Sequence, residues 1–175
     1  MMKKVIGSRV DLQNYSNLEI AEFRSYVDDI LTEDKVKKLE GFEQHFRTSR
    51  LQHSINVAYY SFKIAKKIGA DPKASTRAGF LHDLYWYDWH TKKIPQHHAL
   101  FHPRLAAKNA ARVLDDLSIV EEDAIIKHMW PLSLGFPKYK ESYVVTLADK
   151  YAAALEITSQ WGKHFGEMSL RWAKR

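Results

Sequence analysis

The sequence predicts an all-α fold in a single domain, and three observations support this prediction. Apolar residues recur every three or four positions along most of the chain, which is the spacing of amphipathic helices. No run of alternating apolar and polar residues indicates a strand. The 175 residues, of which 45% are hydrophobic, suffice for one buried core but not comfortably for two. We therefore expect one helical bundle over residues 1–175, with its core at about 50–160.

Two helices are predicted near the N-terminus, where residues that commonly cap helices precede helically spaced apolar residues. Asn17 can cap a first helix that runs through Ile30. Thr32 can cap a second helix that runs through Phe42. We expect both helices to be N-terminal additions to the core.

The helix boundaries in the middle of the chain carry the strongest sequence signals. One helix is predicted from Ser49 to about Gly69, since glycine readily adopts the left-handed conformation at a helix end. The next begins at Asp71-Pro72, with the aspartate as cap and the proline at the first helical position. It places His82-Asp83 at its C-terminal end. The segment from Tyr85 to His98 is rich in aromatic residues, and we expect it to form a loop over a site.

Four more helices are predicted in the rest of the chain. His102-Pro103 begins a helix that reaches Leu114, and the spacing of Ser118 and Glu121 is that of a capping box at the start of a helix ending near His128. A long helix is predicted from about Tyr139 to Gln160. The tail from Trp161 to Trp172 is expected to be another amphipathic helix, packed on the domain or on a partner subunit. A homo-oligomer would then form through this tail.

The composition narrows the classes of function. The chain has no cysteine, which excludes disulfides and thiolate ligands, so any metal must bind nitrogen and oxygen atoms. No apolar stretch approaches the roughly 20 residues that span a bilayer, and the first residues lack a signal segment, so we expect a soluble cytoplasmic protein that does not bind membranes. The net charge of +6 suits an anionic substrate. Nucleic-acid binding is disfavoured because the basic residues are interleaved with acidic ones.

Several histidine and aspartate residues stand in, or directly after, apolar helical segments. Any one of the nine histidines could be an ordinary surface or core residue. A polar side chain set into an apolar segment is costly to bury without a partner, and a shared metal would be such a partner. Imidazole and carboxylate groups both bind first-row transition metals. In chain order, the candidate ligands are His53, His82, Asp83, His102, His128 and Asp149.

The segments around these candidates resemble the HD-domain superfamily of metal-dependent phosphohydrolases. The resemblance extends from about Arg50 to Ala154, and the matching segments follow the superfamily's order. They are LQHSINVA at residues 51–58, GFLHDL at 79–84, HP at 102–103, IKH at 126–128 and LADK at 147–150. Residues 87–90, 128–132 and 137–141 further resemble a bacterial group called simply HD-domain proteins.

The resemblance implies an HD-type helical bundle with a binuclear metal site. One metal would be held by His53, His82, Asp83 and Asp149. The histidines of binuclear members correspond to His102 and His128, and Asp83 would bridge to the second metal. Three further histidines compete as ligands but lack the proline and helix start that follow His102; they are His90, His97 and His98.

The expected cofactors are two divalent metal ions, with His82 and Asp83 as the catalytic pair. The resemblance favours Fe or Mn, while Ni, Co and Zn stay open because affinity order does not select among them. Two such ions can acidify a bridging water, orient it toward phosphorus and offset the charge on the phosphoryl oxygens. The expected substrate is therefore a small phosphorylated metabolite or nucleotide.

Two basic residues are candidates for binding the phosphate. Arg50 lies three residues before His53, on the same helical face, and its guanidinium could bind phosphate through two hydrogen bonds. Alternatively, it is a surface arginine paired with a carboxylate. Lys150 follows Asp149 and could contact substrate. A nucleotide base could stack on aromatic residues, which could instead anchor the loop: Tyr85, Trp86, Tyr87, Trp89 and Trp130.

Two alternatives to hydrolysis remain open. Mixed-valence di-iron oxygenases that resemble myo-inositol oxygenase share the six-ligand pattern. Some HD-like domains are non-catalytic modules, but these have lost ligands, whereas all six are present here. One departure concerns substrate: some cyclic-dinucleotide phosphodiesterases of the superfamily have Gly-Lys where this chain has Tyr85-Trp86, which argues against cyclic di-GMP hydrolysis.

Overall fold

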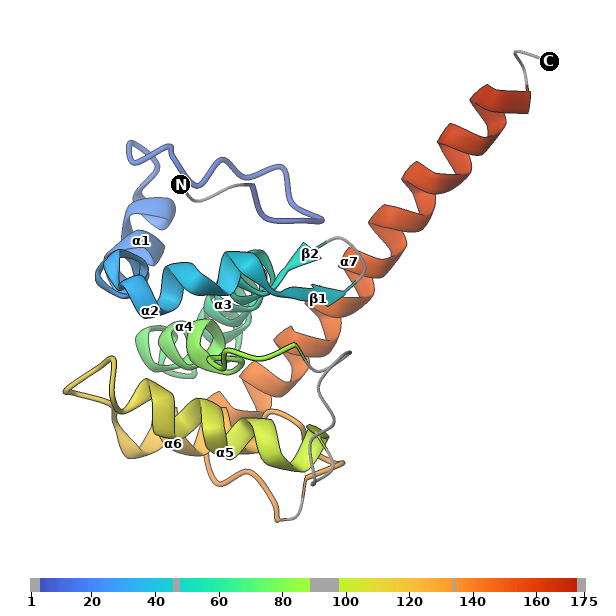
Figure 1. The fold of residues 1–175 in the computed structure, drawn as a ribbon. Helices are drawn as coiled ribbons and strands as arrows, with labels where there is room; N and C mark the ends of the chain where they lie inside the picture. The colour runs from blue at the N-terminus through green and yellow to red at the C-terminus, as the bar shows by residue number, and fades with distance from the viewer. Residues whose placement is uncertain (1–3, 46–47, 89–97, 134, 173–175) are drawn as a thin grey trace.

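The computed structural model describes residues 4–45, 48–88, 98–133 and 135–172, and these residues are mostly helical (Figure 1). The predicted all-α fold class is confirmed. The helices are α1 (Leu18–Thr32), α2 (Asp34–Lys37), α3 (Arg50–Ile68), α4 (Pro72–Leu81), α5 (His98–Ala110), α6 (Ile119–Lys127) and α7 (Lys140–Trp172), with a 3₁₀ turn η1 (Lys38–Gly41). Two short strands, β1 (Glu43–His45) and β2 (Thr48–Ser49), pair antiparallel. Among the described helices, none is long and apolar enough to cross a membrane.

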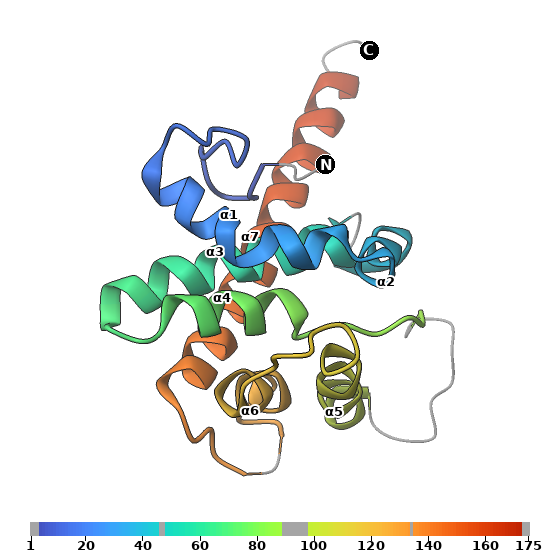
Figure 2. The ribbon, with the colours of Figure 1, turned by 90° about the vertical axis from the view of Figure 1, so that its left-hand side faces the viewer.

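Helix α3 lies at the centre of the bundle and packs against both α4 and α7. Helix α6 packs against α4 and α7, α5 packs against α6, and α1 covers α4 on the opposite side (Figure 2). Phe23, Phe62, Phe80 and Ile125 come from four of these helices and are fully buried in one apolar core. Burial of such side chains stabilises the fold by roughly 1.5–3 kcal/mol each.

Most of the predicted helix starts are confirmed, because each is made by a local contact. Asn17, Ser49 and Asp71 accept hydrogen bonds from backbone N–H groups in the first turns of α1, α3 and α4. The capping box at Ser118 is present at the start of α6. Gly69 ends α3 in the left-handed conformation, with φ of 68°.

The region between α1 and α3 differs from the prediction. Thr32 is the last residue of α1 instead of a cap, and α2 is preceded by Glu33 and has only four residues. Phe42 lies outside the helix, in extended backbone, and its carbonyl accepts a 2.7 Å hydrogen bond from Arg50 N. The strands that follow contain three and two residues, which is too short for an alternating pattern to show in the sequence.

Two further boundaries were predicted wrongly. Helix α5 begins at His98 and contains Pro103 in its interior, so His102-Pro103 is not its start. A proline costs one intrahelical hydrogen bond, and this helix tolerates the loss within its second turn. The backbone of α7 continues without a break from Lys140 to Trp172, so the tail is not a separate helix. The C-terminal part of α7 extends away from the other helices in both views (Figures 1 and 2).

Candidate metal centre

The structure brings all six candidate ligands together in the interior of the bundle. His53 lies in α3, His102 in α5 and Asp149 in α7. His82 and Asp83 directly follow the last residue of α4, and His128 directly follows α6. All are buried except Asp149, whose side chain is 14% exposed. Five helices therefore contribute to one site.

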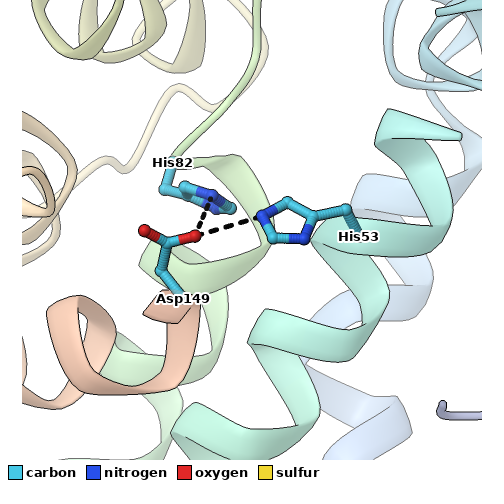
Figure 3. Close-up of side chains that lie close together, drawn as sticks. All are labelled: His53, His82 and Asp149. Atoms are coloured by element: carbon cyan, nitrogen blue, oxygen red, sulfur yellow. Dashed lines mark hydrogen bonds and ion pairs between the residues drawn. The ribbon is translucent and has the colours of Figure 1, made fainter. Parts of the chain in front are cut away.

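Three of these side chains form the first ligand group, defined here as His53, His82 and Asp149. Figure 3 shows them pointing toward one another from α3, the end of α4 and α7. The Oδ1 atom of Asp149 is 3.2 Å from His53 Nε2 and 3.7 Å from His82 Nε2. One ligand atom from each residue lies within 4.8 Å of the others, which is close enough for all three to bind one ion.

The other three side chains form the second ligand group, defined as Asp83, His102 and His128. The Oδ1 atom of Asp83 is 3.2 Å from His102 Nε2 and 3.7 Å from His128 Nε2. Its other oxygen, Oδ2, is 3.5 Å from His82 Nε2, in the first group. Each carboxylate oxygen of Asp83 therefore faces one group. This is the position that a bridging ligand needs.

The four histidines share one hydrogen-bonding pattern on the side of the ring away from the site. The Nδ1 atoms of His82, His102 and His128 each lie 2.8 Å from a backbone carbonyl oxygen. That of His53 lies 3.0 Å from Glu156 Oε1. Carbonyl and carboxylate oxygens only accept hydrogen bonds, so each Nδ1 carries a hydrogen. In the neutral ring, Nε2 then has a lone pair directed into the site.

These lone pairs point at one another, and too few hydrogen-bond donors among the described residues lie nearby to pair with them. His82 Nε2 is buried and makes no hydrogen bond within the described part of the chain. His102 Nε2 and His128 Nε2 lie 2.9 Å apart, so two lone pairs face each other unless a proton or a cation intervenes. Buried polar atoms are nearly always satisfied in proteins. Nitrogen and oxygen donors in this arrangement fit a divalent transition metal.

The pKa values of His53 and His128 are shifted in opposite directions. Burial lowers the pKa of His53, but the carboxylates of Glu156 and Asp149 outweigh this effect and raise it to about 10. Burial lowers the pKa of His128 to about 3, and the neighbouring His82 and His102 contribute to the decrease. His128 is thus neutral at pH 7.

Both aspartates are ionised at neutral pH. Burial alone would raise the pKa of each carboxyl group, but the surrounding histidines outweigh it and hold both pKa values below the usual range. The two carboxylates therefore bring negative charge into the site. Such a site attracts a cation.

Arg50, a candidate for binding phosphate, is fully buried. Its Nε donates a 2.8 Å hydrogen bond to Gln44 Oε1, and its Nη1 donates one of 2.8 Å to the carbonyl of Tyr85. The guanidinium also lies over the Tyr85 ring, 3.7 Å from its centroid. Gln44 in turn donates a hydrogen bond to Asp83 Oδ2. These contacts connect Arg50 to the site through Gln44, and its role in binding phosphate stays a prediction.

Lys150, the other phosphate candidate, lies at the surface beside the second ligand group. Its side chain is exposed, and its Nζ donates a 3.2 Å hydrogen bond to the carbonyl of His128. A substrate that reaches His128 from the solvent side would therefore meet this ammonium group. Its role also stays a prediction.

The described aromatic residues that could stack on a base are buried or partly buried. Tyr85 is fully buried, and the Trp86 indole donates a hydrogen bond to the carbonyl of Lys35, so both anchor the segment after α4. The ring of Trp130 packs against Phe136 and Tyr143. Trp89, together with the competing ligands His90 and His97, lies outside the described residues.

The third competing ligand, His98, is the first residue of α5. Its ring stacks on His102 with centroids 4.5 Å apart, and its Nδ1 lies 3.1 Å from the hydroxyl of Tyr87. Its backbone carbonyl accepts the hydrogen bond from His102 Nδ1. His98 therefore supports a candidate ligand and is not a member of either ligand group.

Sequence reasoning missed two residues that contact the candidate ligands. Glu156 bonds to His53 from α7, seven residues after Asp149 and hence on the same face of that helix. This spacing could have revealed it. Gln44 comes from β1, which carried no sequence signal.

Comparison with known proteins identifies a family model that matches the chain. The family model described as HD domain matches residues 50–154, which is more than half of the chain and includes all six candidate ligands. No curated protein and no solved structure matches. Gln44 and Glu156 both lie outside the matched residues.

Proposed function

The chain belongs to the HD domain family, whose members are typically metal-dependent phosphohydrolases, and we propose that it hydrolyses a small phosphorylated metabolite or a nucleotide. The observation that carries this proposal is the meeting of four imidazole Nε2 atoms and two carboxylates at one site inside the bundle. Every Nδ1 is engaged on the side of the ring away from the site, so every Nε2 is directed toward the site. Hydrolysis through an activated water needs no nucleophilic side chain, consistent with a chain that has no cysteine.

We propose that the two ligand groups hold two divalent ions, Fe or Mn. His53, His82 and Asp149 would hold one ion, and His102 and His128 the other, with one Asp83 oxygen for each. Bound ions of this kind acidify a water, orient it toward phosphorus and offset charge on the phosphoryl oxygens. The buried rings are held by backbone carbonyls or by Glu156, so the ligands are preorganised.

His82 and Asp83 are the proposed catalytic pair, because they connect the two groups. Asp83 has one oxygen toward each group, and His82 Nε2 lies within reach of both aspartates. Gln44 restrains the Asp83 carboxylate through a hydrogen bond to Oδ2. Any movement of this pair would change the geometry of both groups at once.

Lys150 is the proposed contact for the substrate phosphate. Its ammonium group is exposed, and it stands beside His128, a member of the second group. The net charge of +6 favours approach of an anionic substrate in general. Arg50 is buried, and we propose that it acts on phosphate only if the segment after α4 moves.

Elemental analysis and a substrate screen test the proposal together. Protein purified without chelator should contain about two equivalents of first-row metal. Nucleotides, dinucleoside polyphosphates and sugar phosphates would be screened anaerobically with Mn²⁺ and with Fe²⁺. Turnover with Mn²⁺ in the absence of oxygen supports a hydrolase, whereas turnover that requires oxygen and an Fe(II)/Fe(III) signal would establish an oxygenase instead.

Two variants make the metal analysis specific to the site. His82→Ala removes a ligand of the first group, and we expect it to lose bound metal. Lys63→Ala is the control because Lys63 is exposed and pairs with Glu19, away from both ligand groups. Equal metal content in wild type and His82→Ala would refute the ligand assignment.

A further inference from the structure

Glu156 is a buried acidic residue that the proposed reaction does not use. It lies on α7 and is fully buried. Its two carboxylate oxygens are 3.0 and 3.1 Å from His53 Nδ1, and its Oε1 also accepts a 2.7 Å hydrogen bond from Asn56 Nδ2. Burying a carboxylate is costly unless hydrogen bonds compensate it. The contact with His53 should therefore explain why this carboxylate is buried.

The partner of His53 differs in kind from those of the other three candidate ligands. The Nδ1 atoms of His82, His102 and His128 face neutral backbone carbonyls, whereas that of His53 faces a full negative charge. A carboxylate on the far side of a ligating imidazole fixes the tautomer and the ring orientation, and it makes the nitrogen on the metal side more basic. This effect is confined to the first ligand group.

The carboxylate of Glu156 is itself fixed by contacts on its other side. The Oδ1 atom of Asn56 accepts hydrogen bonds from Gln52 Nε2, at 2.9 Å, and from the backbone N–H of Ile6, at 3.1 Å. The Asn56 amide therefore has only one orientation that satisfies all its contacts, with Nδ2 directed at Glu156. A chain of hydrogen bonds thus runs from the N-terminal segment to the Nδ1 of His53.

We propose that Glu156 is a positioning residue that orients His53 and strengthens its bond to the ion of the first ligand group. This inference rests on the proposed metal-binding function. Glu156 touches neither a candidate ligand atom on the metal side nor the space between the ligands. It acts through the His53 ring alone.

The test is a titration of metal-free protein with Mn²⁺ or Zn²⁺, comparing wild type with Glu156→Gln. Glutamine keeps the size of the side chain and an oxygen that can accept from both His53 and Asn56, while its amide nitrogen replaces the oxygen 3.1 Å from His53 Nδ1, so the substitution removes the charge and one acceptor. Loss of an outer partner of a ligating histidine typically weakens metal binding about 10- to 100-fold. We expect this loss for one equivalent of metal, with binding of the other unchanged.

A second measurement reports directly on the ring. Nitrogen-15 NMR of the zinc-bound protein distinguishes the two His53 nitrogens, and the Nδ1–H resonance should shift in Glu156→Gln while those of the other three candidate ligands remain. A residue that only supports the fold would not change one imidazole selectively. Asn56→Ala gives a second variant that keeps the charge but releases the carboxylate, and we expect a smaller loss of affinity at the same equivalent.

Glu121→Gln is the matched control. Glu121 is also a buried carboxylate, but its partners are Arg77 and Ser118, which belong to neither ligand group. It should lower thermal stability and leave both metal affinities unchanged. If Glu156→Gln and Asn56→Ala fold and bind both equivalents as wild type does, the inference is overturned and the proposed function stands. If wild type itself binds no metal, the proposed function fails instead.

Discussion

The Nε2 atoms of His102 and His128 lie 2.9 Å apart, although each ring donates its Nδ1 hydrogen to a backbone carbonyl in the opposite direction. Two neutral rings in this arrangement direct lone pairs at each other. Because the pKa of His128 is depressed to about 3, protonation of that ring does not relieve the repulsion near neutral pH. A proton on His102, whose pKa is raised by Asp83, or a bound cation would relieve it, and a cation that does so would stabilise the folded state.

Metal should therefore raise the stability of the protein. An ion that binds only the folded state at a concentration one hundred times its dissociation constant adds about 2.7 kcal/mol. We expect the thermal midpoint to rise on addition of Mn²⁺ and to fall again with chelator. The measurement is a thermal melt followed by circular dichroism, with His128→Ala as a variant whose midpoint should respond less. A midpoint insensitive to both metal and chelator contradicts the site.

Metal binding should release protons. With a pKa raised to about 10, His53 carries a proton at neutral pH in the metal-free protein, donated from Nε2 toward Asp149 Oδ1. The ion needs that lone pair, so the proton must leave. Affinity should therefore increase with pH, by up to about tenfold per unit below the pKa. Calorimetry in two buffers of different ionisation enthalpy counts the protons, and zero release would show that His53 does not bind the ion.

Arg50→Ala should destabilise the protein more than it impairs catalysis. The substitution leaves Gln44 Oε1 and the carbonyl of Tyr85 buried without a donor, and removes the cation over the Tyr85 ring. Loss of a buried charged donor costs about 1.5–3 kcal/mol per hydrogen bond. Urea denaturation measures this loss. Arg112→Ala is the control, since Arg112 is exposed and should change stability by no more than about 0.5 kcal/mol.

The Arg50→Ala variant also distinguishes a structural role of Arg50 from a role in binding the substrate phosphate. If Arg50→Ala is as stable as wild type but loses roughly ten- to a hundredfold in kcat/KM, the guanidinium contacts the substrate and the structural role is wrong. A large loss of stability with unchanged kinetics below the melting temperature supports the buried role.

Lys150→Ala should impair catalysis more than it destabilises the protein, which is the opposite of the result expected for Arg50→Ala. The side chain is exposed, so its removal should barely change stability. If it binds phosphate, a charge-assisted contact worth about 1.5–3 kcal/mol predicts a loss of roughly ten- to a hundredfold in kcat/KM on the best substrate. Lys63→Ala is the control, because Lys63 is also exposed and pairs with Glu19, away from both ligand groups. Equal kcat/KM in the two variants would show that Lys150 does not bind the substrate phosphate.

Local signals allowed much of the fold to be predicted from the sequence. Asn17, Asp71 and Ser118 cap helices through bonds to residues two or three positions away, so the signal and the structure lie in the same few residues. His102-Pro103 misled the prediction because a proline can occupy the interior of a helix as well as its start. The rule describes a preference and does not fix the residue at which a helix begins.

The parts of the site that were missed depend on contacts between distant segments. Gln44 reaches Asp83 across 39 positions, from a strand that forms only because its backbone pairs with residues just before α3. Glu156 shares a helix face with Asp149, but only its contact with His53, 103 positions away, distinguishes it from other acidic residues. The six candidate ligands were found because the family's motifs preserve their local context.

The separation between the ligands along the chain has a consequence for folding kinetics. His53 and Asp149 are 96 positions apart, and they meet only when α3 and α7 have docked. Closing so long a loop is entropically costly, and contacts of this kind slow the folding of a chain. We expect the six ligands to reach their final geometry only after this docking, once the rate-limiting barrier has been crossed. Interactions absent from the transition state stabilise a protein by slowing its unfolding. Bound metal should accordingly extend the lifetime of the native state while the rate of refolding stays nearly constant.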